Sequence, residues 1–236
     1  MKNKIMMIII PILCLLLAIL GYLNVTNKES DSLKFKNEYE SLNNLENYKN
    51  NQMKIDSNNP IKYSNYDEII DIIKNKTGII YLGFPECPWC RRSVSVLLDV
   101  SKDMKIDKIY YLNIKDERDS YEVQDGKLTY AKDDNGLEKK GTKGYFKLLK
   151  LLDEHLTDYV ISYEDKLYEV GEKRIYAPTV VFVKDGKIIG LHVSTVASHT
   201  DASVPLTKEQ YNELYEIYED YILELDDSTC SSNSSC

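Results

Sequence analysis

The sequence has no excess of basic residues. Its 236 residues include 30 Lys and Arg against 38 Asp and Glu, which gives a formal net charge of −8. A protein that binds nucleic acid needs a basic face to contact phosphate groups, whereas here both signs of charge are scattered through the same segments. We therefore expect no nucleic-acid partner.

Metal-ligating residues and cysteines are also scarce. The only histidines, His155, His192 and His199, show no ligand spacing, so we expect no metal site and no other cofactor. No internal repeat is present. Of the five cysteines, Cys14 lies in an apolar run and the others form two close pairs at the positions 87, 90, 230 and 236. A chain of this length forms a core without a metal or a disulfide.

The N-terminal apolar run is the one long hydrophobic stretch. Lys2 and Lys4 precede the run 5–23, which would span about 28 Å as a helix, close to the thickness of a bilayer. The lysines favour a cytoplasmic N-terminus, with the remainder of the chain outside the cell. Because no A-x-A cleavage pattern follows, residues 1–27 are predicted to be retained as a membrane anchor. The alternative is a signal segment whose cleavage releases the protein.

The composition divides the rest of the chain into three parts. Residues 28–51 are polar, with a few apolar residues at helical spacing, and this pattern predicts a stalk with one amphipathic helix. Residues 52–225 are predicted to form one globular domain, interrupted by a polar, turn-rich insertion over about 115–141. Residues 226–236 form a small, polar tail.

The domain alternates predicted strands and helices. The apolar run 79–84 is typical of a strand buried on both faces, and a helix over 88–102 and a strand over 109–112 follow it. This order predicts a parallel βαβ unit. Two β-rich runs, 180–183 and 188–191, flank an Asp-Gly turn and predict an antiparallel hairpin. Further helices are predicted over 65–76, 142–156 and 207–225, and a further hairpin over 159–170. The fold class is therefore α/β, with a mixed central sheet flanked by helices.

The segment PECPWC contains the two cysteines that are predicted to react. Cys87 is placed between a strand and a helix, as the N-cap, with Pro88 at the first helical position. Unpaired N–H groups and the helix dipole stabilise a thiolate there, and Cys90, one turn later, reaches the same sulfur. A redox-active pair is therefore predicted. The alternatives are a permanent disulfide and half of a zinc site, which would need two more ligands.

These features resemble the thioredoxin superfamily over residues 52–225. The resemblance lies in the order of elements, in CPWC at a strand-to-helix junction and in Ala177-Pro178-Thr179 before a hairpin. The anchor, the insertion and the phrases YLGFPECPWC and RIYAPTVVFVKDGK resemble the extracytoplasmic thioredoxin-like proteins of Gram-positive bacteria known as bacteriocin-transport accessory proteins. The resemblance implies a thioredoxin-like fold with an insertion before the strand that follows a cis-proline.

The resemblance also implies roles for residues around the cysteines. Pro178 would be cis and lie against Cys87 and Cys90, and the backbone of Ala177 would pair with an extended substrate. Trp89 would present a flat apolar surface to a substrate peptide.

Two positions depart from the thioredoxin pattern. Tyr81 stands where thioredoxins have a buried Asp, and Glu86 stands where they have Trp. A carboxylate at position 86 would raise the pKa of the neighbouring thiol unless Arg91 or Arg92 neutralises it; Glu86 is also a candidate for proton transfer. Both arginines are otherwise expected to be solvated on the helix surface.

The sequence therefore predicts a membrane-anchored thiol–disulfide oxidoreductase. Its substrates would be disulfides or dithiols of exported proteins or peptides, and a redox partner would reset its own dithiol. The alternative is a non-catalytic accessory or binding protein for a secreted peptide or its transporter. The intact cysteine pair favours the enzyme. Cys230 and Cys236 are interpreted as an inert tail disulfide or a second redox pair.

Overall fold

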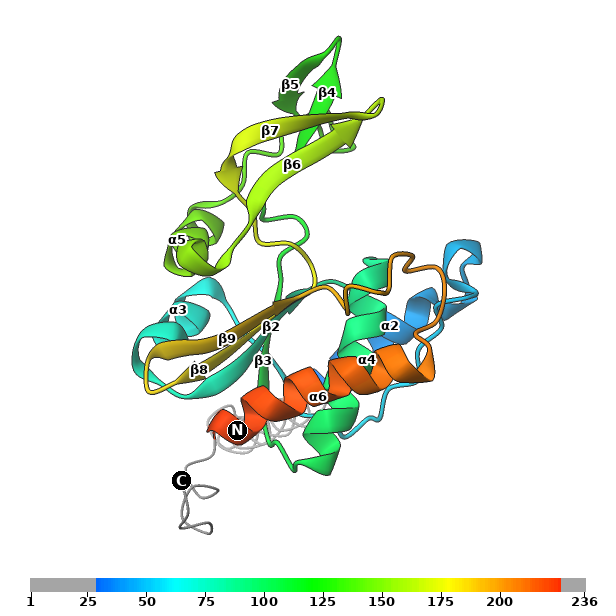
Figure 1. Ribbon diagram of the computed structural model, residues 1–236, viewed down its shortest axis with the longest axis vertical. Coiled ribbons are helices and arrows are strands. Elements are labelled where there is room, and N and C mark those ends of the chain that lie inside the picture. The colour runs from blue at the N-terminus through cyan, green and yellow to red at the C-terminus, as the bar shows by residue number, and fades with distance from the viewer. Residues whose placement is uncertain (1–28, 226–236) are drawn as a thin grey trace, which may run out of the picture.

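A five-stranded mixed sheet forms the centre of the computed structural model, which describes residues 29–225 (Figure 1). The strands lie in the order β1-β3-β2-β8-β9. Strand β3 pairs in parallel with β1 and β2, while β8 pairs antiparallel with β2 and β9. The strand bounds are Ile61–Tyr63 for β1, Gly78–Gly83 for β2, Ile109–Asn113 for β3, Thr179–Lys184 for β8 and Lys187–Val193 for β9.

The predicted βαβ unit is confirmed. Strand β2 leads through α4, Pro88–Asp103, to the parallel strand β3. Successive residues of β2 face opposite sides of the sheet, as strand geometry requires, so Tyr81 enters one apolar cluster and Leu82 the other. The predicted hairpin around Asp185-Gly186 is confirmed as β8 and β9.

Helices cover both faces of the sheet. Helices α2 (Asp31–Glu40), α4 and α6 (Lys208–Leu225) pack on one face, and α3 (Tyr66–Asn75) and α5 (Lys143–Leu152) pack on the other. Thr207 and Gln210 form the predicted capping box of α6, with each backbone N–H bonded to the other's side-chain oxygen. The α/β class and the helix-flanked mixed sheet are thus as predicted.

The N-terminal segment differs from the predicted stalk. Its helix α2 places Phe35 and Tyr39 fully inside the core, against the sheet. Two short 3₁₀ helices, Ser41–Asn44 and Glu46–Tyr48, then lead back to the domain. The helical spacing was interpreted correctly for Asp31–Glu40, where Phe35 and Tyr39 are buried against the domain rather than on a separate stalk, whereas Leu33 and Leu45 are exposed.

The side chain of Arg91 fixes this polar segment to α4. The prediction that Arg91 is solvated on the helix surface is wrong. The side chain is only 1% exposed and donates to the carbonyl oxygens of Tyr39, at 2.7 Å, and Asn51, at 2.8 Å, and to Oδ1 of Asn43, at 2.6 Å. A buried guanidinium is tolerated only when its donors are bonded. Arg92, by contrast, remains partly exposed and bonds carbonyl groups at the surface.

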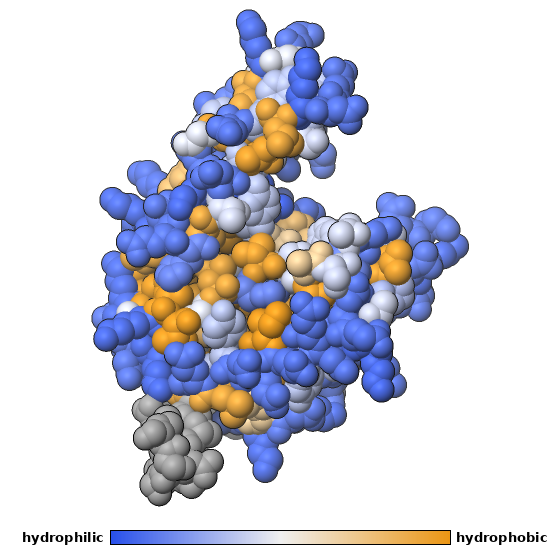
Figure 2. Space-filling model, in the orientation of Figure 1, coloured by the Kyte–Doolittle hydropathy of each residue, from blue (hydrophilic) through white to orange (hydrophobic). Residues whose placement is uncertain are grey.

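Two hairpins project from the body of the molecule (Figure 1). The predicted insertion contains β4 (Tyr121–Gln124) and β5 (Lys127–Tyr130), and the second predicted hairpin is β6 (Asp158–Tyr163) with β7 (Lys166–Lys173). Rings of Tyr121 and Tyr159 join them, with centroids 5.9 Å apart. Figure 2 shows the surface hollowed between these hairpins and the body, with apolar side chains gathered below the hollow.

No helix within residues 29–225 has the length and apolarity to cross a membrane. The predicted anchor 1–27, with Cys14, and the tail with Cys230 and Cys236 lie outside the described residues.

Candidate functional site

Cys87 occupies the N-cap of α4, as predicted. Strand β2 ends at Gly83 and α4 begins at Pro88, so the connection places Cys87 in extended geometry, with φ −75° and ψ 117°, just before the first turn. Its Sγ accepts a hydrogen bond from the backbone N–H of Cys90 at 3.3 Å. Both cysteines are free thiols. Local chain geometry alone therefore brings the two sulfurs to the same helix terminus.

The two thiols have opposite electrostatic environments. The pKa of Cys87 is lowered, first by a hydrogen bond from the Cys90 thiol, and further by backbone N–H groups of Cys90 and Trp89 and the charge of Arg118, against the effect of burial. Burial raises the pKa of Cys90, which is 0% exposed against 7% for Cys87. Cys87 is thus the more exposed thiol and the one that ionises more readily, whereas Cys90 is favoured in its protonated form.

The loop before β8 lies against the dithiol. The Ala177–Pro178 peptide bond is cis, as the resemblance implies. The Cys87 thiol donates to the carbonyl oxygen of Ala177, at an Sγ–O distance of 3.3 Å. Among residues 29–225, nothing accepts a hydrogen bond from the N–H of Ala177. One backbone donor beside the sulfur is therefore open to an incoming peptide.

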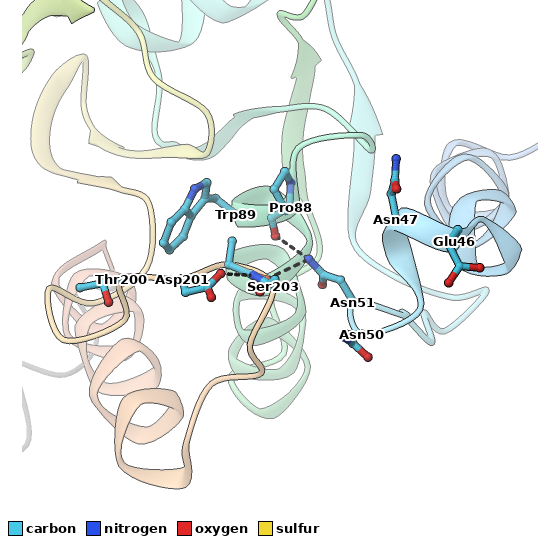
Figure 3. Close-up of a pocket in the computed structure, with 10 residues that line it drawn as sticks. Glu46, Asn47, Asn50, Asn51, Pro88, Trp89, Thr200, Asp201 and Ser203 are labelled. Atoms are coloured by element: carbon cyan, nitrogen blue, oxygen red, sulfur yellow. Dashed lines mark hydrogen bonds between the residues drawn. The ribbon is translucent and has the colours of Figure 1, made fainter. Parts of the chain in front are cut away.

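Trp89 lines a pocket next to the dithiol (Figure 3). The pocket has a volume of about 400 Å³, and its walls come from residues 46–51 and from the loop 200–203. The indole is partly buried, with its ring centroid 5.3 Å from that of His199. The two ring nitrogens of His199 form hydrogen bonds with the hydroxyl of Thr195 and with the carbonyl of Val204. The predicted apolar surface at Trp89 is thus one side of a pocket with mainly polar walls.

Glu86 is neutralised, but by a residue that we did not predict. Its Oε1 lies 2.6 Å from Nζ of Lys115, and neither Arg91 nor Arg92 pairs with it. Lys115 follows β3 by two residues, and the ends of parallel neighbouring strands meet at one edge of the sheet. The predicted parallel pairing of β2 and β3 was therefore a signal for this contact. The proton-transfer role of Glu86 stays a prediction.

Arg118 is a site residue that sequence reasoning missed. Its half-buried guanidinium lies over the ring of Phe84, 4.9 Å from the centroid. The neighbouring carboxylate of Asp119 is paired instead with Arg174, at 3.7 Å. Within the part of the chain that the structure describes, Arg118 has no ion pair and no hydrogen bond. Its position at the start of the insertion gave no sequence signal for an unpaired positive charge near Cys87.

Replacing Arg118 with methionine should therefore raise the pKa of Cys87. We expect a rise of about one unit or less, because a half-buried charge is partly screened. The measurement is the rate of Cys87 alkylation by iodoacetamide as a function of pH. Lys127→Met, which removes an exposed charge from the same insertion, is the control. An unchanged pH profile in Arg118→Met would show that the guanidinium has no influence on the thiolate.

Comparisons with known proteins add no assignment. The chain matches no protein-family model and no curated protein. Over residues 29–225, no group of three or more His, Cys, Asp or Glu side chains is arranged to hold a metal ion.

Proposed function

We propose that this chain is a thiol–disulfide oxidoreductase with a thioredoxin-like fold. One observation carries the proposal: Cys87, at 7% the more exposed of the two thiols, caps a helix and accepts a hydrogen bond from the backbone N–H of Cys90, and its pKa is lowered. A permanent disulfide has no free thiol, and an inert buried cysteine has no need of a helix terminus that favours its thiolate.

The fold supports the thioredoxin-like assignment. A parallel βαβ unit carries the cysteine pair, an antiparallel hairpin follows the Ala177-Pro178 loop, and a final helix packs beside α4 on one face of the sheet. This is the arrangement that the resemblance implies. The finer likeness to bacteriocin-transport accessory proteins remains a proposal that depends on the sequence phrases.

The reaction uses two exchanges of sulfur bonds. The Cys87 thiolate attacks one sulfur of a substrate disulfide, so a Cys87–substrate disulfide forms and the other substrate sulfur leaves as a thiolate. Cys90 then loses its proton and attacks the Cys87 sulfur, which forms the Cys87–Cys90 disulfide and releases the second substrate thiol. The substrate gains two electrons and two protons. The reverse sequence passes the disulfide to a dithiol.

Substrates would approach as extended peptides. The open N–H of Ala177 lies beside the Cys87 sulfur, and Trp89 lines the adjoining pocket, so a peptide can bond to the loop while a neighbouring side chain enters the pocket. With the run 5–23 as a membrane anchor, these substrates would be exported proteins or peptides. A separate redox partner would restore the dithiol after each cycle.

A Cys90→Ser variant tests the proposal. It keeps the attacking sulfur but removes the resolving thiol, so it should accumulate mixed disulfides with exported proteins in the producing cell. These adducts appear as bands on non-reducing gels and disappear on reduction.

The matched control is the double variant Cys87→Ser with Cys90→Ser, which keeps the remaining cysteines and should lose the adducts that Cys90→Ser accumulates. A non-catalytic binding protein would retain its partner in both variants without a reducible bond. The absence of reducible adducts in Cys90→Ser would therefore reject the enzyme in favour of that alternative.

A further inference from the structure

The side chain of Arg118 presents a guanidinium with unused hydrogen-bond donors. Its Cζ lies 4.9 Å from the centroid of the Phe84 ring, and the side chain is partly exposed. The N–H donors of a guanidinium lie in its own plane, so a ring that covers one face uses none of them. Among residues 29–225, no carboxylate and no other acceptor bonds to these donors. Their partial burial costs free energy that an incoming acceptor would recover.

The carboxylates on either side of Arg118 in the chain are held by other groups. The carboxylate of Asp119 lies 3.7 Å from Arg174, which also donates to the backbone carbonyl of Asp119 at 2.9 Å. Glu117 accepts a hydrogen bond from the Thr142 hydroxyl at 3.3 Å. The fold therefore leaves Arg118 unpaired although a carboxylate directly precedes and another directly follows it.

Arg118 lies beside the turn that carries the nucleophile. The backbone N–H of Cys87 donates to the carbonyl oxygen of Phe84 at 3.3 Å, so the residue whose ring contacts Arg118 closes a turn with Cys87. The charge of Arg118 is also one of the causes of the lowered pKa of Cys87. Glu86, within the same turn, is paired with Lys115 at 2.6 Å. A substrate carboxylate that approaches Cys87 would therefore meet a guanidinium that no carboxylate of residues 29–225 occupies.

This position is separate from the pocket beside Trp89. The pocket is lined by residues within 46–51, 88–89 and 200–203 (Figure 3), whereas Arg118 belongs to the insertion. Successive side chains of an extended peptide point in opposite directions, so different residues of one peptide bonded to Ala177 can reach the pocket and Arg118. Arg118 thus offers a second point of recognition, and its charge defines what it accepts.

We propose that Arg118 is a specificity-determining residue that binds a carboxylate of the substrate next to the reactive substrate cysteine. The inference depends on the proposed function and names a substrate class for it. The guanidinium donates parallel hydrogen bonds to the two oxygens of the carboxylate, a pairing that its planar fork of donors matches. The carboxylate comes from an Asp or Glu side chain, or from the C-terminus of a peptide that ends at its cysteine.

The test measures how fast Cys87 forms a mixed disulfide with short peptides, in the full chain purified in detergent. Cys90→Ser is the background, so that the adduct persists and mass spectrometry after acid quenching follows its formation. Each peptide is closed by one disulfide and blocked at both ends, with Glu, Gln or Lys next to one cysteine. The Glu peptide should react about five- to tenfold faster than the Gln peptide, as expected for a charge-assisted hydrogen bond at a partly exposed site. The Lys peptide should be slowest.

A second pair of peptides ends at the cysteine, either as the free acid or as the amide. A faster free acid would show that a C-terminal carboxylate is bound in the same way as an acidic side chain. Preference for one of the two carboxylate sources alone would support the site and assign it to that source.

In Arg118→Met, the advantage of the carboxylate peptides should fall to about one. Loss of this charge also slows every peptide by raising the pKa of Cys87, so the ratio between two peptides in one variant separates recognition from reactivity. Arg118→Lys keeps the charge but not the paired donors and should retain part of the preference. Lys127→Met, the control, should retain all of it.

Two results would overturn the inference. One is equal rates for the carboxylate peptides and their amides when Arg118 is present. The other is an unchanged ratio in Arg118→Met. Failure of every peptide to form a disulfide with Cys87 would instead reject the proposed oxidoreductase itself.

Discussion

Replacing Cys87 with serine should reduce disulfide exchange by about a thousandfold or more, to the background rate. A serine hydroxyl is not ionised near neutral pH and does not attack a disulfide, and the buried Cys90 has no direct access to a substrate. The measurement is the rate at which the purified chain reduces a peptide disulfide in the presence of dithiothreitol. Cys90→Ser, which retains the nucleophile, should still form the first mixed disulfide. Residual turnover in Cys87→Ser would assign the attack to another thiol.

The rate at which Cys87 is alkylated should depend on pH in a predictable direction. An ordinary thiol is mostly protonated below about pH 8.5 and reacts slowly there. Because the pKa of Cys87 is lowered, its alkylation rate should persist below that pH and fall only as the pH drops through the lowered pKa. A half-maximal rate at or above the ordinary thiol range would contradict the electrostatic account of the site.

Arg91→Met should reduce the stability of the fold more than the loss of any other polar side chain of α4. It removes the donor of the buried carbonyls of Tyr39 and Asn51, while the amide oxygen of Asn43 keeps its second hydrogen bond, from the backbone N–H of Met53. Hydrogen bonds to a charged group contribute about 1.5–3 kcal/mol each, partly offset here by the desolvation of the guanidinium. We expect a net loss of about 3 kcal/mol, which for a domain of this size lowers the melting temperature by about 10 °C.

Arg92→Met provides the comparison on the same helix. Its side chain is partly exposed, its partners at Asn50 and Ser203 can bond to water instead, and the carbonyl of Ala202 keeps a bond from the Asn51 amide, so the melting temperature should fall by only a few degrees. Equal losses in the two variants would show that Arg91 does not clamp the N-terminal segment to α4. Calorimetry on the full chain in detergent measures both.

Local sequence pattern was enough to predict most of the elements. The run before Gly83 has the length and composition of a doubly buried strand, and Pro88 marks the start of α4, so the N-cap position of Cys87 follows from neighbours in the chain. The Asp185-Gly186 turn and the capping box at Thr207 are equally local. These features depend on residues within a few positions of one another.

Contacts between distant residues account for what was missed. Phe35 and Tyr39 showed helical spacing, but they are buried by contacts with Tyr81 and Tyr111, more than forty positions later. The partner of Glu86 is Lys115, from beyond the next strand, and Arg118 comes from an insertion. The predicted pairing of β2 and β3 brings Lys115 to the same edge of the sheet as Glu86, but no periodicity or cap signal identifies which side chains pair there, because such pairs form only when the sheet and its helices assemble.

The burial of α2 also limits the reach of the dithiol. Because α2 begins at Asp31 and packs on the core through Phe35 and Tyr39, only residues 24–30 lie between the apolar run 5–23 and this helix. Seven residues extend at most about 25 Å. If the run 5–23 is the proposed membrane anchor, so short a connection would keep the folded body, and with it the dithiol, close to the outer lipid surface.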